Sequence, residues 1–318
     1  MSASSGNSLR MQAVAVAEAD SPVLLATPPA AAPFWTARRK LLLALAGVYL
    51  IWSSTYLVMR VAVAGLPPLL MGSVRFITAG AVLLTLLRAR GAAFPPARVW
   101  LLSLPAGALL FGVGNGFVAL AERTLSSGLA ATVCATMPLW AAALGALMGA
   151  RATRRELVGM ALGFAGVVLL GSGDLGAGGV PAILLLLSPL GWALGSLIGR
   201  KLAPYGMMAA ATQMLCGGVL TLLAGLLLGE RFPASPPAES VGALVYLIVF
   251  GSLLGFSAYT YLLQHARPAL ATSYAYVNPA LAVLLGAALG EHVGPEAIAA
   301  TALIAAAVAV LVTRRRAG

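Results

Sequence analysis

Long apolar blocks dominate the chain from residue 41 onward. Each block runs for about 17 to 25 residues, the length that a helix needs to cross a hydrocarbon core about 30 Å thick. Neither turn-bounded strands nor helices with a polar face follow residue 40, although a soluble chain of this length would need them. The pattern therefore predicts helices that span a membrane.

Ten blocks of this kind follow one another. Their connections are short and carry helix breakers, such as the run from Gly65 to Pro68. We therefore predict an all-α fold, that of a polytopic membrane protein with ten transmembrane helices. The expected spans are 41–59, 68–87, 99–120, 126–148, 156–172, 180–198, 205–228, 241–263, 269–289 and 296–313.

The charged residues are few and lie mostly between the blocks. They make up 9% of the 318 residues, against roughly 25% in a soluble domain. The net charge of +11 comes from short cationic clusters and not from a basic stripe interleaved with aromatic residues, which argues against nucleic acid and for the lipid bilayer as partner. Cys134 and Cys216 lie in separate apolar blocks, so we interpret both as small core residues.

Residues 1–37 differ from the rest of the chain. They are rich in Ala, Ser and Pro and lack the charged start and unbroken apolar core of a signal peptide. We expect a disordered cytoplasmic tail that ends at the basic cluster 38–40.

The distribution of cations predicts the topology. Of the 20 Lys and Arg residues, all but four lie in the tail, the even-numbered loops or the C-terminal end. Arg60, Arg123 and Arg231 lie in odd-numbered loops, and Arg75 lies within a span. By the positive-inside rule, we expect both termini in the cytoplasm.

An ungapped alignment of the chain with itself indicates an internal repeat. The aligned pairs include Pro138 with Pro279, Leu129 with Leu270, Ala130 with Ala271, and Gly145 with Gly286. Two halves of five spans each, 38–175 and 176–318, would have opposite orientations. Such inverted repeats are typical of secondary transporters, which bind substrate near the membrane midplane between the halves.

Several short motifs in these spans are similar to those of one transporter family. They are Tyr49 to Tyr56 in the first span, Leu66-Pro67-Pro68 and Arg75-Phe76 in the second, Ala121-Glu122-Arg123 after the third, Met137-Pro138-Leu139 in the fourth and Ala271 to Pro279 in the ninth. In order and spacing, the chain resembles the EamA family of the drug/metabolite transporter superfamily, and most of all its inner-membrane metabolite exporters. The resemblance implies ten spans in the bacterial plasma (inner) membrane, an inverted repeat and efflux by alternating access. It implies no particular cargo, because relatives move amino acids, sugars, nucleotide sugars and organic cations.

Polar residues within the spans are the candidates for substrate binding, because polarity at that depth is costly. Arg75 is either an anchor for an anion or carboxylate, or a structural partner of Glu122 or of a helix-end carbonyl. Trp52, Ser53, Thr55 and Tyr56 of the first span and Asn115 of the third are cavity-lining residues or, alternatively, contacts between helices. The remaining candidates are Ser273, Tyr274, Tyr276 and Asn278 before Pro279, Thr136 before Pro138, and Trp192.

Energy coupling is left open by the sequence. Every acidic residue lies at the end of a predicted span or outside it, and only Glu122 and Glu291 are candidates for a proton-linked role at the mouth of the cavity. Proton antiport and uncoupled diffusion both remain open.

The function that these observations favour is export of small metabolites, such as amino acids, amines or drug-like compounds, by a secondary transporter. The alternative is a carrier of sugars or nucleotide sugars. A membrane enzyme is less favoured, because the two histidines fall on opposite sides, and a channel needs a ring of similar polar residues. We expect a small-molecule substrate as partner, no cofactor and no metal, and a homodimer stays open.

Overall fold

The computed structural model describes residues 34–148, 154–171, 178–266, 274–290 and 292–312, and these residues contain helices and no strands. The chain divides into two units, residues 1–40 and 41–318. The helices of the first half are α2 (Phe34–Gly65), α3 (Pro68–Ala89), α4 (Ala97–Gly107), η1 (Ala108–Gly116), α5 (Phe117–Ala121), α6 (Ser127–Cys134), α7 (Met137–Leu147) and α8 (Arg154–Gly171). Those of the second half are α10 (Gly179–Gly199), η2 (Arg200–Tyr205), α11 (Gly206–Leu227), α12 (Ala238–Tyr246), η3 (Leu247–Leu254), α13 (Gly255–His265), α15 (Tyr274–Ala288) and α16 (Pro295–Val312).

The described helices have the length and composition of membrane spans. Six stretches are long and apolar enough to cross a membrane, and one of them, Gly179–Leu227, contains both α10 and α11. Three shorter apolar helices accompany them: Leu157–Gly166, Val277–Ala288 and Pro295–Ala307. Large apolar side chains such as Leu50, Leu101 and Phe164 are exposed, as expected of a surface that contacts lipid. The predicted all-α membrane fold is confirmed, and the count of ten spans stays a prediction.

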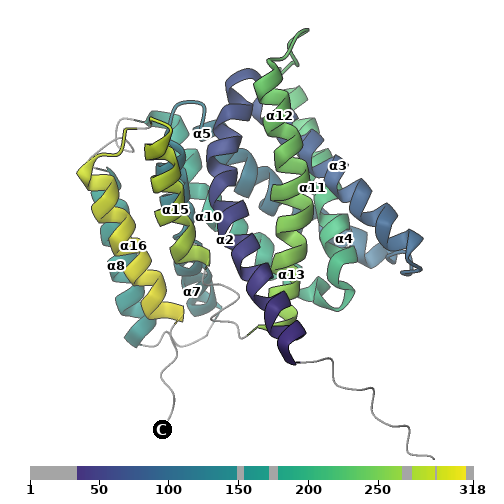
Figure 1. Cartoon of the computed structure of the whole chain (residues 1–318), viewed down its shortest axis with the longest axis horizontal. Helices are drawn as coiled ribbons and strands as arrows, with labels where there is room; N and C mark the ends of the chain where they lie inside the picture. Colours follow the sequence, from purple (N-terminus) through teal and green to yellow (C-terminus); the bar gives the residue numbers. More distant parts are fainter. Residues whose placement is uncertain (1–33, 149–153, 172–177, 267–273, 291, 313–318) are drawn as a thin grey trace, which may run out of the picture. The chain divides into compact units, whose positions relative to one another are not determined.

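Helices that correspond in the two halves pack against each other. α8 begins at Arg154 and α16 at Pro295, which are 141 positions apart, as are Pro138 and Pro279. These two helices lie side by side (Figure 1). The arrangement is consistent with two structural repeats.

The contact between α3 and α11 shows the relative direction of the repeats. A Cβ at Gly80 would lie 3.0 Å from the carbonyl oxygen of Ala211, and one at Gly225 would lie 3.1 Å from Cβ of Leu69. The start of each helix therefore meets the end of the other, so α3 and α11 run antiparallel. Inverted halves require this direction for corresponding helices.

The third helix of each half contains a π-helical segment. η1 lies between α4 and α5, and η3 lies between α12 and α13. The apolar pattern predicted unbroken helices over 99–120 and 241–263, and it carries no signal for this widening. Such segments are frequent at functional sites, because the wider turn changes the direction of side chains and carbonyls.

Pro138 and Pro279, which the internal alignment pairs, differ in their local structure. α6 ends at Cys134, and a new helix, α7, begins at Met137 just before Pro138. Pro279 instead lies inside the continuous helix α15. The break in the first half thus has no matching break among the described residues of the second.

Candidate substrate cavity

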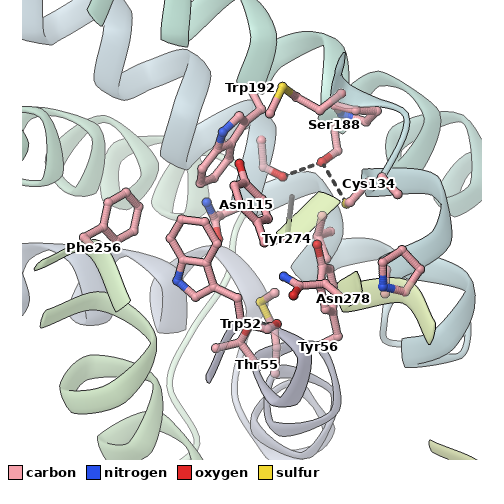
Figure 2. Close-up of a pocket in the computed structure, with 18 of the residues that line it drawn as sticks. Trp52, Thr55, Tyr56, Asn115, Cys134, Ser188, Trp192, Phe256, Tyr274 and Asn278 are labelled. Carbon is pink, nitrogen blue, oxygen red and sulfur yellow. Dashed lines mark hydrogen bonds between the residues drawn. The ribbon is translucent and has the colours of Figure 1, made fainter. Parts of the chain in front are cut away.

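A cavity of about 100 Å³ lies among helices of both halves. The first half contributes residues of α2, α3, η1, α5, α6 and α7, and the second half contributes residues of α10, α13 and α15. Figure 2 shows that the labelled side chains from these helices converge on one space. The lining residues are Trp52, Thr55, Tyr56, Met59, Arg75, Gly114, Asn115, Val118, Ala131, Cys134, Ala135, Met137, Ser188, Pro189, Trp192, Phe256, Tyr274, Asn278 and Pro279.

Aromatic rings form one wall of this cavity. The Trp52 ring lies with its centroid 4.9 Å from that of Tyr274 and 5.6 Å from that of Phe256, both in edge-to-face contact. The ring of Trp192 lies 6.3 Å from that of Phe256. This wall offers apolar faces to the apolar or planar part of a ligand.

Arg75 is the charged side chain in the lining. It is 4% exposed, its Nε donates a hydrogen bond of 2.9 Å to Ser252 Oγ, and its Cζ lies 4.7 Å from the centroid of the Phe76 ring. It also interacts electrostatically with Glu122. Arg75 therefore both reaches the cavity and has structural partners, so neither of its two predicted roles excludes the other.

Glu122 is buried, although its backbone lies at the end of a helix. It caps α5 and is 1% exposed. Besides Arg75, it interacts electrostatically with Tyr56 and Cys134. It does not line the cavity itself, so its charge acts on the cavity through these neighbours.

Polar groups of the cavity contact η1 from both halves. Asn115 Nδ2 donates to the carbonyl of Leu110 at 3.1 Å. Ser188, from α10, donates to the carbonyl of Gly114 at 2.7 Å and lies 3.9 Å from Cys134 Sγ (Figure 2). Hydrogen bonds to these carbonyls hold the π-helical segment in place.

Two predicted residues lie beside the cavity and do not line it. Ser53 is fully buried, and its Oγ lies 3.2 Å from Asn278 Oδ1, which joins α2 to α15. Thr136 is buried and donates to the carbonyl of Val133 at 2.7 Å. Both side chains support lining residues or the helix break before Pro138.

Three of the remaining predicted residues have no described side chain. Ser273 and Glu291 lie outside the described residues, and for Tyr276 only the backbone in α15 is described. The other predicted binding residues, which lie together in the lining, are Trp52, Thr55, Tyr56, Arg75, Asn115, Trp192, Tyr274 and Asn278.

Sequence reasoning missed further lining residues, among them Cys134, Ser188 and Phe256. Ser188 had a usable signal, since it is a hydroxyl between leucines and a proline in an apolar span. Cys134 and Phe256 had none, because each looks like an ordinary core or lipid-facing residue. Within the described part of the chain, no group of His, Cys, Asp and Glu side chains could hold a metal ion.

Sequence comparison gives two matches to one family. The profile of the EamA-like transporter family matches residues 39–172 and again residues 180–313. The two matches begin 141 positions apart, at residues 39 and 180, which is the spacing of Pro138 and Pro279. The repeat seen in the sequence is thus the repeat of this family.

Named relatives cover most of the chain. A protein called "Uncharacterized inner membrane transporter YedA", from Escherichia coli (strain K12), is 46% identical over 250 residues, 78% of this chain and 82% of its own. "Protein PecM" of Dickeya dadantii (strain 3937) is 29% identical over 245 residues, 74% of this chain and 80% of its own. A solved structure called "Crystal structure of protein" matches with a TM-score of 0.60 and 23% identity, over 87% of this chain and 96% of the other. This last likeness concerns the fold alone.

Proposed function

Because this chain belongs to the EamA-like transporter family, and is thus a multi-pass membrane transporter and not an enzyme, we propose that it exports small metabolites by alternating access. The substrate site is the cavity lined by both halves. The location is the bacterial inner membrane, as the name of the Escherichia coli relative says of that protein. Both termini lie in the cytoplasm, as the distribution of cations predicts.

One observation carries this proposal: the cavity is shared between two antiparallel repeats. Trp52 and Arg75 come from the first half, whereas Trp192 and Tyr274 come from the second. A movement of one half against the other therefore changes the cavity from two sides at once. This is the geometry that alternating access needs.

Two hollows adjoin α2. Met59 lines the central cavity, and the next residue, Arg60, lines a second and wider hollow. His292 and Ser126 line this second hollow as well. With the N-terminus inside the cell, the C-terminal end of α2 faces the outside, so the second hollow lies on the export side.

The lining favours amino acids, amines or drug-like compounds over sugars. Aromatic faces cover much of the wall, and several polar side chains there, such as Thr55, Asn115 and Ser188, already donate to backbone carbonyls. A sugar site needs a hydrogen-bond partner for most hydroxyls of its ligand. Sugars and nucleotide sugars remain the alternative that the transport test includes.

The coupling that we propose is proton exchange through Glu122. Its carboxyl is buried and interacts electrostatically with Arg75 in the lining, so a change in its charge changes the charge balance at the substrate site. Glu291 stays a second proton-linked candidate. If Glu122→Gln transports as well with a pH gradient as without one, while the native chain responds to that gradient, Glu122 is the coupling residue.

The test uses the purified full chain in proteoliposomes. A labelled panel of amino acids, polyamines, aromatic cations, monosaccharides and nucleotide sugars is screened for saturable uptake and for counter-transport. Native Cys134 then reports on the site, in a Cys216→Ala background, because Cys134 lines the cavity. A transported compound should protect Cys134 from N-ethylmaleimide. Transport without protection would place the substrate elsewhere, and flux that neither saturates nor exchanges would indicate a channel.

A further inference from the structure

We propose that Ser252 and Gly251 position the Arg75 guanidinium, and that Arg75 held in this way narrows the cargo classes named above to compounds with an anionic group, such as amino acids, over simple amines. This inference rests on the transport function proposed above. Neither Ser252 nor Gly251 lines the cavity, so each acts through Arg75 and not on the substrate.

Ser252 fixes one edge of the guanidinium. It lies in η3 with 0% exposure, and its Oγ accepts the hydrogen bond from Arg75 Nε at 2.9 Å. A guanidinium is planar, so a bond at Nε fixes the plane of the two terminal nitrogens as well. The edge formed by those nitrogens is the one that pairs with a carboxylate in a bidentate contact.

Gly251 lets the guanidinium lie close to the backbone of η3. A Cβ at residue 251 would lie 3.0 Å from Arg75 Nη2 and 3.0 Å from Thr55 Cγ2. Any other residue here would therefore push against both cavity residues. The Phe76 ring, 4.7 Å from Arg75 Cζ, adds a cation–π contact.

The charges around the cavity determine its preference. Among the described residues of the lining, Arg75 alone carries a charge. Glu122, whose carboxylate interacts with Arg75, does not belong to the lining and is 1% exposed. A molecule in the cavity therefore contacts the guanidinium directly, whereas the Glu122 carboxylate acts on it across the lining side chains of Arg75, Tyr56 and Cys134, so an anionic group is favoured.

The experiment measures this preference without knowledge of the cargo, through the native thiol of Cys134 in a Cys216→Ala background. Three methanethiosulfonate reagents react with the purified full chain: one carrying a sulfonate, one carrying a trimethylammonium group and one neutral. The rate with the neutral reagent measures access, and the ratio of the anionic to the cationic rate measures the charge preference. Cys134→Ala verifies the labelled site.

We expect the anionic reagent to react faster, and the ratio of rates to fall by at least about tenfold in Arg75→Gln, because loss of the guanidinium charge slows the anionic reagent and speeds the cationic one. Ser252→Ala and Gly251→Ala should lower the ratio in the same direction, since the first removes the hydroxyl and the second displaces the guanidinium. Ser252→Thr, which keeps the hydroxyl, should restore it. The control is Ser103→Ala, which removes an equally buried hydroxyl that bonds to Thr212 at 2.8 Å outside the cavity.

The outcomes separate the two proposals. A ratio that falls in Arg75→Gln but not in Ser252→Ala or Gly251→Ala overturns the positioning role and leaves the cavity intact. A ratio unchanged in Arg75→Gln overturns the anion preference. No reaction of Cys134 with any reagent would overturn this inference, because no charged group would then enter the cavity beside Arg75, and the transport panel would still test the proposed function by itself. Because two variants disturb Arg75 independently, failure of one to fold does not prevent the test.

Discussion

The π-helical segments η1 and η3 interrupt corresponding helices of the two halves, and the opposite half binds each of them. Ser188 of the second half donates to Gly114 in η1. Trp52 of the first half donates from Nε1 to the carbonyl of Gly251 in η3 at 3.3 Å. The fold thus places a widened turn at the same position in each repeat and joins it to the other repeat.

The two segments differ in charge. The hydrogen bonds at η1 come from neutral side chains, Asn115 and Ser188, whereas η3 also accepts a hydrogen bond from the Arg75 guanidinium. Packing distinguishes η1 as well: Gly107, directly before η1, lies against the backbone of α11. The comparison shows that the repeat provides the positions and that single substitutions within it provide the chemistry.

Arg75→Ala removes the charged donor that distinguishes the contacts of η3 from those of η1. We expect this variant to have the largest effect. Transport of the solute identified by the panel should be lost, and the stability should fall by about 3 kcal/mol because buried Glu122 loses its cationic partner. Thermal unfolding in detergent, followed by size-exclusion chromatography, measures the second effect.

The control for Arg75→Ala is the double variant with Glu122→Gln. Removing the buried carboxylate should recover much of the stability but none of the transport. If the double variant is no more stable than Arg75→Ala alone, the interaction of the two charges does not stabilise the fold.

Gly107→Ala should cause the next largest loss of stability. A Cβ there would lie 2.4 Å from the carbonyl oxygen of Gln213 and 2.6 Å from the backbone nitrogen of Gly217. Since backbone atoms cannot move aside, we expect a loss of about 3 kcal/mol, visible as a lower unfolding temperature. Gly112→Ala is the matched control, because its nearest contact would be 3.5 Å away, and equal losses in both variants would contradict the packing argument.

The sequence predicts the helices and many of the polar and aromatic residues of the cavity, because both depend on physical patterns that are local. Apolar length gives the spans, and costly polarity within them marks Trp52, Arg75 and Asn278. The two prolines at equal spacing mark the repeat. None of these arguments needs tertiary information.

The same patterns cannot give contacts between helices. Nothing near Ser252 indicates that Arg75, far away in the chain, donates to it, and the π-helical turns leave the apolar pattern unchanged. Glu122 was predicted at the end of a span, which is correct for its backbone, but the burial of its side chain depends on neighbouring helices. Partners of this kind need the packed structure.

Ser188→Ala tests η1, the π-helical segment whose carbonyls accept from the neutral side chains of Asn115 and Ser188. It removes the 2.7 Å hydrogen bond to the carbonyl of Gly114 in η1, and hydrogen bonds between membrane helices contribute up to about 1.7 kcal/mol. We expect the stability to fall by about 1 kcal/mol, measured by thermal unfolding, and the apparent KM of transport to change moderately. No change in either measurement would show that α10 does not hold η1 through this bond.

Trp52→Phe should have the smallest effect on stability, and it tests the matching bond at η3. The variant keeps a ring against Tyr274 and Phe256 but removes the Nε1 donor, whose bond to Gly251 is longer, at 3.3 Å, than the bond from Ser188. We therefore expect a loss of about 0.5 kcal/mol, the average for such bonds, measured by the same thermal unfolding. η3 keeps its bond to Arg75 in this variant, whereas η1 keeps only neutral partners in Ser188→Ala. A larger loss for Trp52→Phe than for Ser188→Ala would mean that the tryptophan, and not the guanidinium, is the main contact between η3 and the first half.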